Sequence, residues 1–386
     1  MTMLDTYTPA WMTEDLEIFK DAVHKFYTRE FAPLSDKWTK QGMVDRDAWN
    51  KAGEAGLLCA SIPEEYGGAG GDYRHEAILV EEMERTGVAG FGNTVHSLIC
   101  AHYINAYGSE EQKNHILPKM ATGEMVCAIA MTEPGTGSDL QSVKTTALKE
   151  GNQYVINGSK TFISNGQHAD LVIVVAKTDP SEGAKGISLM LVETNDQTEG
   201  FARGRNLDKM GQHAADTSEL FFDDVKVPAS AVLGGEEGRG FYQLMQQLPA
   251  ERLIIAAQGL GSMERAIELT VAYTRERKTF GNAVFDYQNT QYKLAECKAT
   301  WMAARAMVDQ LTMQLMKGEL DANSAAAAKF WVTERQCEVI DICLQFFGGY
   351  GYMDEYPISR MYTDARVQRI YGGSNEIMRM LVARSL

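Results

Sequence analysis

The chain has 386 residues, which is enough for two or three domains with sizeable hydrophobic cores. Its composition, 45% hydrophobic and 23% charged, is typical of a globular protein. The formal net charge of −15 argues against a general nucleic-acid binder and against a protein that binds anionic membranes. It leaves room for a local basic pocket that binds a polyanionic small molecule.

The cysteines and the N-terminal residues bear on where the protein works. The six cysteines contain no CxxC pair, which favours reduced and mostly buried thiols in an intracellular protein. No apolar run reaches the ~18 residues of a membrane span. Acidic Asp5, Glu14 and Asp15 argue against a signal or transit peptide. We therefore expect a cytoplasmic, bacterial protein without a membrane span.

Residues 1–126 are predicted to be helical. Over residues 14–30, apolar residues recur at spacings of three and four, as on one face of a helix: Leu16, Phe19, Val23 and Phe26. Thr13 is a suitable N-cap for this helix, and Pro33 is expected to end it. Further helices are predicted at residues 73–85 and 94–107, and a short one that Ser109 caps.

The pattern changes to strands from Cys127 to about Gly235. Asn157-Gly158 lies between β-prone runs and predicts a hairpin turn. Further strands are predicted at residues 171–176, 187–192, 218–222 and 225–227. Strands that follow one another without helices between them favour a compact β-barrel or sandwich.

From Gly240 to the C-terminus the pattern is helical again. Long helices are predicted near residues 249–276, 287–317 and 323–347, with a last helix at 374–384. Each long helix would extend roughly 40 Å, and the connections are short. Long helices with short connections favour an up-down bundle.

One loop stands at the change from helices to strands. Residues 129–139 read IAMTEPGTGSD, with Pro134, Gly135 and Gly137 between the hydroxyl groups of Thr132, Thr136 and Ser138. Such a loop exposes backbone N–H groups and short side-chain donors, which suits a polar ligand edge or a phosphate. An ordinary loop capped by Ser138 and Asp139 is the alternative.

This loop resembles the flavin-binding signature of the acyl-CoA dehydrogenases. The resemblance covers nearly the whole chain and includes EEYGGAG, GSEEQKNHILP, GSKTFISNG, DTSELFFDDVKVPASAVLG, RKTFG and the C-terminal YGGSNEIM. It implies a mostly α protein with a central β domain, in the arrangement of that family. The implied domains are an N-terminal helical domain (1–126), a β-barrel (127–235) and a C-terminal four-helix bundle (236–386).

The resemblance implies FAD as the cofactor and no metal ion. The residues at family flavin positions are Ile129, Ala130, Met131, Thr132, Gly137, Ser138, Phe162, Ile163, Ser164, Arg277, Tyr287, Gln288, Gln345, Phe346, Phe347, Gly348, Gly349, Ser374, Asn375 and Glu376. Many relatives have tryptophan at the Phe162 position, but phenylalanine still supplies an apolar wall. The planar cation of Arg277 suits the pyrophosphate.

Each flavin segment also has a simpler interpretation. Residues 162–164 could be a strand that packs on the β core, and Arg277 could be a solvated charge at a helix end. In the family, several of the flavin contacts cross a subunit boundary. The resemblance therefore implies a homotetramer, a dimer of dimers.

The implied reaction needs a base, because desaturation removes a proton from the carbon next to the thioester. Many family members carry a glutamate for this purpose in a Tyr-Glu-Gly-Thr motif, whereas residues 371–374 read Tyr-Gly-Gly-Ser. The segment LPAERL resembles the long-chain and isovaleryl branches, which implies Glu251 as the base. Alternatively, Glu251 only follows Pro249 in the first turn of a helix, where the helix dipole favours it. Glu376 is a weaker candidate.

Substrate positions of the family fall on Ser138, Lys185, Tyr242, Arg252, Gly372 and Gly373. The backbone N–H of Gly372 would hold the thioester oxygen together with a flavin hydroxyl, and Lys185 could reach a CoA phosphate or be a solvated lysine.

The implied function is FAD-dependent conversion of medium-chain, long-chain or methyl-branched acyl-CoA to trans-2-enoyl-CoA in fatty acid β-oxidation or related catabolism. Electrons would pass to electron-transfer flavoprotein. The pattern is most similar to the long-chain branch. Two alternatives are an oxygen-using acyl-CoA oxidase of the same fold and a flavin-free acyl-CoA-binding scaffold.

Overall fold

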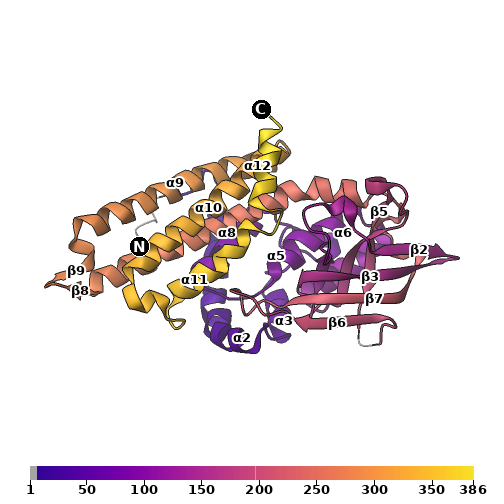
Figure 1. Ribbon diagram of the computed structural model, residues 1–386, viewed down its shortest axis with the longest axis horizontal. Helices are drawn as coiled ribbons and strands as arrows, with labels where there is room; N and C mark the ends of the chain where they lie inside the picture. Colours follow the sequence, from indigo (N-terminus) through magenta and orange to yellow (C-terminus); the bar gives the residue numbers. More distant parts are fainter. Residues whose placement is uncertain (1–6, 196) are drawn as a thin grey trace.

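The structure is a computed structural model that describes residues 7–195 and 197–386. Helices form the N-terminal and C-terminal parts of the chain, and a seven-stranded sheet lies between them in the sequence. The sheet occupies one end of the longest axis, and a small two-stranded hairpin, β8–β9, lies at the opposite end (Figure 1). This arrangement confirms the predicted class, mostly α with a central β region.

The N-terminal helices agree with the predicted periodicity except near Pro33. They are α1 (Glu14–Phe26), α2 (Ser35–Gln41), α3 (Asp47–Glu54), α4 (Tyr73–Thr86), α5 (Asn93–Val95), α6 (Ala101–Tyr107) and α7 (Glu110–Thr122). The Thr13 hydroxyl accepts from the N–H of Leu16, as an N-cap does. Pro33 does not end the helical path, because it sits near the start of a short 3-10 segment, Ala32–Leu34, where a missing N–H is harmless.

The sheet is mixed and open at its ends. Its strands are β1 (Cys127–Ala130), β2 (Thr146–Glu150), β3 (Gln153–Ser164), β4 (Leu171–Lys177), β5 (Ile187–Glu193), β6 (Phe201–Asn206) and β7 (Thr217–Pro228). Strand β4 pairs in parallel with β1 and β2 and antiparallel with β5, while β3 pairs with β2 and β7. The two strands predicted at 218–222 and 225–227 are one strand, β7.

The predicted hairpin turn at Asn157-Gly158 is wrong. Strand β3 continues through both residues, with an irregularity in its pairing to β7 between Ile156 and Gly158, and the turn lies earlier, between Glu150 and Gln153, which pair across it. A Cβ built on Gly158 would lie 2.4 Å from the side-chain oxygen of Thr145. Glycine is therefore needed here because a neighbouring segment packs closely, and not because the chain reverses.

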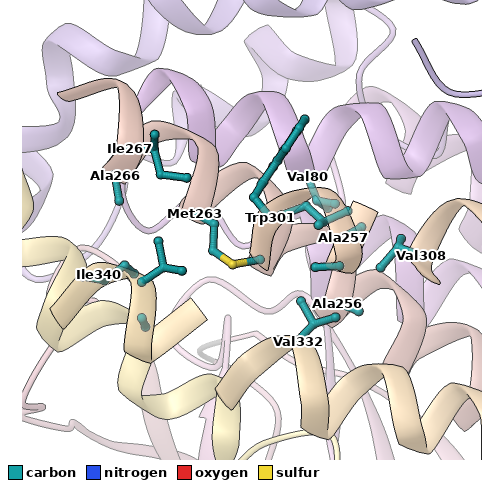
Figure 2. Close-up of a cluster of buried hydrophobic side chains, with 14 of the residues drawn as sticks. Val80, Ala256, Ala257, Met263, Ala266, Ile267, Trp301, Val308, Val332 and Ile340 are labelled. Atoms are coloured by element: carbon teal, nitrogen blue, oxygen red, sulfur yellow. The ribbon is translucent and has the colours of Figure 1, made fainter. Parts of the chain in front are cut away.

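The C-terminal helices form the predicted bundle. They are α8 (Gly240–Glu276), α9 (Gln288–Met316), α10 (Ala322–Phe346), α11 (Pro357–Ala365) and α12 (Asn375–Ala383). The bundle core contains Met263 of α8, Trp301 of α9, and Val332 and Ile340 of α10, and Val80 of α4 joins the same cluster (Figure 2). The long helices α8, α9 and α10 and the N-terminal helix α4 therefore share one hydrophobic core.

The start of α8 differs from the prediction. The helix begins at Gly240 and not near residue 249, so Pro249 lies inside it. An interior proline removes one helical hydrogen bond. The helix continues through it because Leu244 and Leu248 before the proline, and Leu253 after it, are all buried. Glu251 consequently lies about three turns into a helix and not at a helix start.

Candidate functional site

Glu251 is a buried carboxylate held by a tyrosine from another helix. It is 6% exposed, and the hydroxyl of Tyr103 in α6 donates to its Oε1 at 2.7 Å. Burial disfavours the ionised form and raises the pKa of Glu251 to about 7, against the opposing effects of the Tyr103 hydrogen bond and the charges of Arg252 and His102. The helix start whose dipole would favour the Glu251 carboxylate is absent here, because α8 begins at Gly240.

Glu251 lines a cavity of about 290 Å³. The other lining residues are Tyr73, Glu76, Leu98, Ile99, His102, Gln246, Gln247, Pro249, Ala250, Ile254, Leu315 and Leu320. They come from α4, from the segment 98–102, from α8, from the last turn of α9 and from the turn that follows it. The cavity thus places a carboxylate with a pKa near neutrality beside an apolar wall, an arrangement typical of a site that removes a proton from an apolar substrate.

The loop at residues 371–373 lies beside this carboxylate. Arg252 donates through Nε to the carbonyl of Gly372 at 3.3 Å, and buried Lys329 donates to the carbonyl of Gly373 at 2.9 Å. Burial, with the charge of Arg252, lowers the pKa of Lys329 to about 7. The backbone of Gly372 has φ +65°, and a Cβ on it would lie 2.3 Å from Cδ1 of Ile255. Both features favour glycine at the position where many family members carry a glutamate.

The loop 129–139 is shaped by a buried ion pair. Glu133 accepts from the backbone N–H of Lys144 and of Thr145, and its Oε1 lies 2.9 Å from Nζ of Lys160 in β3. The N–H of Thr161 donates to the carbonyl of Thr132 at 2.9 Å, which joins the loop to β3. A Cβ on Gly137 would meet nothing within 4 Å, so the outer side of the loop is open.

Phe162 in β3 projects outward from the sheet beside this loop. It is 66% exposed and has φ +60°, a strained backbone conformation for a phenylalanine. Ile129 and Met131 pack with Tyr103 and Leu244 in one hydrophobic cluster. The loop and β3 therefore adjoin the helices that surround Glu251.

A second group of predicted flavin residues lies at the far end of α8. The guanidinium of Arg277 lies 5.9 Å from the ring centre of Tyr350, and Phe347 stacks on Tyr273 with ring centres 4.3 Å apart. They surround a cavity of about 460 Å³ whose lining residues are Tyr273, Arg277, Thr279, Val284, Phe346, Phe347, Gly348, Gly349, Tyr350 and Met353. The β8–β9 hairpin (Lys278–Thr279 and Asn282–Ala283) marks this end, opposite the sheet (Figure 1).

The remaining predicted residues are scattered. Half-buried Tyr287 and exposed Gln288 stand at the start of α9, and Gln345 is exposed near the end of α10. Lys185 is exposed in a short helical turn, Gly183–Gly186. The hydroxyl of Tyr242 accepts from Gln246 at 2.6 Å, close to the first cavity. At the start of α12, Glu376 is exposed, whereas Asn375 is buried and bonded to Lys329 and Thr333 within the chain.

Three family models match consecutive parts of the chain: the acyl-CoA dehydrogenase N-terminal domain (residues 13–124), middle domain (128–225) and C-terminal domain (238–386). The chain belongs to the acyl-CoA dehydrogenase family. This membership makes it an oxidoreductase that acts on acyl-CoA, and the resemblance inferred from its motifs is confirmed.

Relatives of this acyl-CoA dehydrogenase are similar along their whole length. A mitochondrial long-chain specific acyl-CoA dehydrogenase of Sus scrofa is 49% identical over 96% of this chain and 86% of its own. A crystal structure of acyl-CoA dehydrogenase from Geobacillus kaustophilus has a TM-score of 0.95 and 44% identity, covering 98% of this chain and 99% of its own. A glutaryl-CoA dehydrogenase from Mycobacterium smegmatis, in complex with FADH2, has a TM-score of 0.90 and 28% identity, covering 97% of this chain and 95% of its own.

The family membership explains the exposed groups of this dehydrogenase. An open loop with exposed Gly137 and Ser138, an exposed phenylalanine on the sheet and an exposed arginine at the far end suit a flat aromatic ring system joined to a diphosphate, as in FAD. Phe162 belongs to β3 of the sheet and Arg277 directly precedes β8, and the sheet and β8 lie at opposite ends of the structure (Figure 1), so one copy does not bring the whole predicted flavin set together.

Several residues of the site were not predicted from the sequence. Tyr103, His102 and Glu76 belong to predicted helices, and Lys329 lies in the middle of α10. The only signal was a polar residue among apolar ones on a helical face, and such residues are usually solvent-exposed. Their convergence on Glu251 and on the 371–373 loop depends on helix packing, which the sequence pattern does not specify.

No helix in the described ranges is both long and apolar enough to cross a membrane. Within the same ranges, no three His, Cys, Asp or Glu side chains are grouped as metal ligands would be.

Proposed function

We propose that the protein catalyses FAD-dependent α,β-dehydrogenation of medium-chain, long-chain or methyl-branched acyl-CoA to trans-2-enoyl-CoA, in fatty acid β-oxidation or related acyl catabolism. Electrons then pass to electron-transfer flavoprotein. The observation that carries the proposal is Glu251, a buried carboxylate with a pKa of about 7 on the wall of a 290 Å³ cavity. A base with a pKa near the working pH combines a large ionised fraction with a strong drive to accept the proton.

Glu251 acts as the base in this proposal. Its Oε1 is committed to Tyr103, and Oε2 has no hydrogen-bond partner among the described residues, so Oε2 takes the proton from the α-carbon. Tyr103 keeps the carboxylate in one orientation and stabilises its charge before the proton arrives. When bound, FAD supplies the acceptor for the hydride that leaves the β-carbon.

The chain's own backbone contributes a donor for the thioester oxygen. The N–H of Gly372 donates in no hydrogen bond within residues 7–195 and 197–386. Arg252 holds the carbonyl of the same residue, so the loop is fixed before substrate binds. A fixed donor beside the thioester stabilises the negative charge that develops on its oxygen as the α-proton leaves.

The apolar side of the cavity supports a medium or long acyl chain as substrate. Leu98, Ile99, Ile254, Leu315 and Leu320 form that side. Burial of each CH₂ group against them contributes about 0.8 kcal/mol to binding. The same apolar lining is compatible with a methyl branch.

We further propose a homotetramer, a dimer of dimers, in a cytoplasmic location. The support for the tetramer is the separation of β3, which carries Phe162, from β8, which follows Arg277, because a second copy could bring an Arg277 to the sheet end of the first. The support for the location is that all six cysteines are free thiols, which a reducing compartment maintains.

The test is anaerobic mixing of the purified, flavin-loaded protein with straight-chain and methyl-branched acyl-CoAs. We expect about one FAD per chain and bleaching of the visible flavin band by medium or long chains. Reoxidation by electron-transfer flavoprotein and not by air would separate a dehydrogenase from an oxidase. A protein that stays colourless after incubation with FAD, or a flavin that no acyl-CoA bleaches, would refute the proposal.

A further inference from the structure

The cavity beside Glu251 has a polar wall that the proposed reaction does not use. Glu76 of α4 is 2% exposed, and its Oε1 lies 2.5 Å from Nε2 of His102. The hydroxyl of Ser61 donates to the same carboxylate oxygen and lies 3.1 Å from the same imidazole nitrogen. Burial alone would lower the pKa of His102, but the charge and hydrogen bond of Glu76 outweigh it and raise that pKa. Glu76 and His102 therefore form an ion pair on the cavity wall, in which the carboxylate is buried and the imidazole is half-buried.

Tyr73 adds an unsatisfied hydroxyl to this wall. It lines the cavity, is 8% exposed, and its buried hydroxyl has no hydrogen-bond partner among the residues that the structure describes. Tyr73 and Glu76 are three residues apart in α4 and so lie on the same face of the helix. A buried hydroxyl without a partner is uncommon, since it loses its hydration and gains nothing in return.

Glu76 and His102 each also have one polar side-chain atom that makes no hydrogen bond to the described residues. Both contacts of the Glu76 carboxylate use Oε1, and Oε2 has no hydrogen-bond partner within the described ranges. Nε2 of His102 faces Glu76, and its Nδ1 likewise bonds to no described residue. The cavity therefore has a donor in Tyr73 and an acceptor in Glu76, and the apolar residues Leu98, Ile254, Leu315 and Leu320 line the same cavity.

A purely hydrocarbon chain would fit this wall poorly. It would cover Tyr73 and Glu76 without supplying a hydrogen bond, and a buried polar group without a partner is unfavourable. An alcohol group can accept from the tyrosine hydroxyl and donate to the carboxylate oxygen at the same time. A ketone or an ether can only accept, and leaves Glu76 Oε2 unsatisfied.

We propose that this cavity selects acyl-CoAs whose chain carries a hydroxyl group beyond the β-carbon, with Tyr73 donating to that hydroxyl and Glu76 accepting from it. The proposal rests on the proposed function, because it assigns the cavity to the acyl chain. In it, Ser61 and His102 position the Glu76 carboxylate and balance its charge. Glu251 keeps its role at the α-carbon, and the new contacts determine which chain is accepted.

The experiment compares octanoyl-CoA with isomers of hydroxyoctanoyl-CoA that carry the hydroxyl at each carbon beyond the β-carbon. We expect kcat/KM for one isomer to exceed that for octanoyl-CoA about tenfold, the effect of one or two net hydrogen bonds. The oxo analogue at the same carbon should gain less, because it cannot donate to Glu76. Equal kcat/KM values for all chains would overturn the proposal and indicate that water makes the hydrogen bonds to Tyr73 and Glu76.

Tyr73→Phe tests the donor. The ratio of kcat/KM for the preferred hydroxy isomer to that for octanoyl-CoA should fall about five- to tenfold, and the dissociation constants of the two ligands should converge in the same way. The melting temperature of the ligand-free protein should stay the same or rise, because the hydroxyl lost had no partner. Tyr27→Phe, at a buried tyrosine outside the cavity, is the matched control and should leave the ratio unchanged.

The outcomes separate this proposal from the proposed function. If no acyl-CoA of either kind bleaches the flavin, the proposed function itself fails. If octanoyl-CoA bleaches the flavin but no hydroxy isomer is preferred, only the selectivity proposal fails. A preference that Tyr73→Phe leaves intact would also contradict it, since the discrimination would then arise elsewhere.

Discussion

The two ends of α8 differ in how much of their surroundings the chain itself provides. Around Glu251, one copy supplies the hydrogen-bond donor from Tyr103, the neighbouring loop at 371–373 and a cavity wall from several helices. Beyond the other end of α8, Arg277 is exposed, Phe280 is 97% exposed and Tyr352 is 86% exposed. Exposed aromatic side chains grouped with an arginine are typical of a binding surface.

The comparison teaches that the base and the diphosphate-binding residues face different requirements. A base needs a low-dielectric pocket, which one folded chain can enclose. The far end offers a cation and aromatic faces, but it lacks the open loop and strand that lie at the sheet end. Variants at Glu251 test whether one copy provides the base for proton abstraction. Variants at Arg277 test whether FAD binding at this end needs a second copy.

The largest effect is expected at Glu251. Glu251→Gln preserves size and can still accept from Tyr103, but it cannot take the α-proton. We expect turnover to fall about 10²–10⁴-fold, while FAD content and acyl-CoA binding persist. The measurement is the rate of anaerobic flavin bleaching.

Glu376→Gln is the control for this prediction. Glu376 is exposed at the start of α12, away from the Glu251 cavity, and its variant should keep measurable chemistry. If Glu251→Gln bleaches as fast as the parent, Glu251 is a structural carboxylate and the base lies elsewhere.

A smaller effect is expected at the open end. Arg277→Ala should weaken FAD binding about 10–100-fold, because a charged hydrogen bond to a phosphate is lost. Lys278→Ala removes the adjacent exposed cation and should change FAD binding little. FAD retained after gel filtration, together with light scattering, measures both the cofactor and the oligomer. An active monomer that retains its full FAD content would contradict the claim that Arg277 binds FAD only in the presence of a second copy.

Stability should respond to Glu251 in a pH-dependent way. The pKa of Glu251 is about 7 in the folded protein, against an ordinary value of 4.5, so ionisation destabilises the fold as pH rises from about 4.5 to 7. Glutamine does not ionise. We expect Glu251→Gln to match the parent in unfolding free energy at pH 4.5 or below and to exceed it by up to about 3 kcal/mol above pH 7. Denaturant titrations at several pH values test this, and a difference independent of pH would contradict it.

The smallest effect is expected at Tyr103. Tyr103→Phe removes the hydrogen bond that stabilises the Glu251 carboxylate, so the pKa of Glu251 should rise by up to roughly one unit. The base works in its ionised form, and the rising limb of the pH profile of kcat/KM should therefore move to higher pH. Tyr107→Phe, one turn further along α6, should leave that limb in place. A profile unchanged in Tyr103→Phe would show that Tyr103 does not tune the base.

Much of the fold could be predicted from the sequence because its signals are local. Apolar residues at three- and four-residue spacing located α1 and α4, and Ser109 caps α7 with Gln112, as expected for that pair. Three local signals misled us: Pro33 as a helix end, the Asn157-Gly158 turn and Pro249 as a helix start. At Gly158 and Pro249, tertiary packing overrides the local preference of the residues.

The sequence by itself determined the family, the order of helices and strands, and Glu251 as the candidate base, because these follow from short motifs and their spacing. Tertiary structure alone decided the protonation behaviour of Glu251, because its pKa depends on burial among helices that are distant in sequence. It also decided that Tyr73, Glu76 and His102 share a cavity wall with that base, and that Phe162 and Arg277 lie far apart. Local periodicity predicts which face of a helix is buried, whereas tertiary packing determines which residues that face contacts.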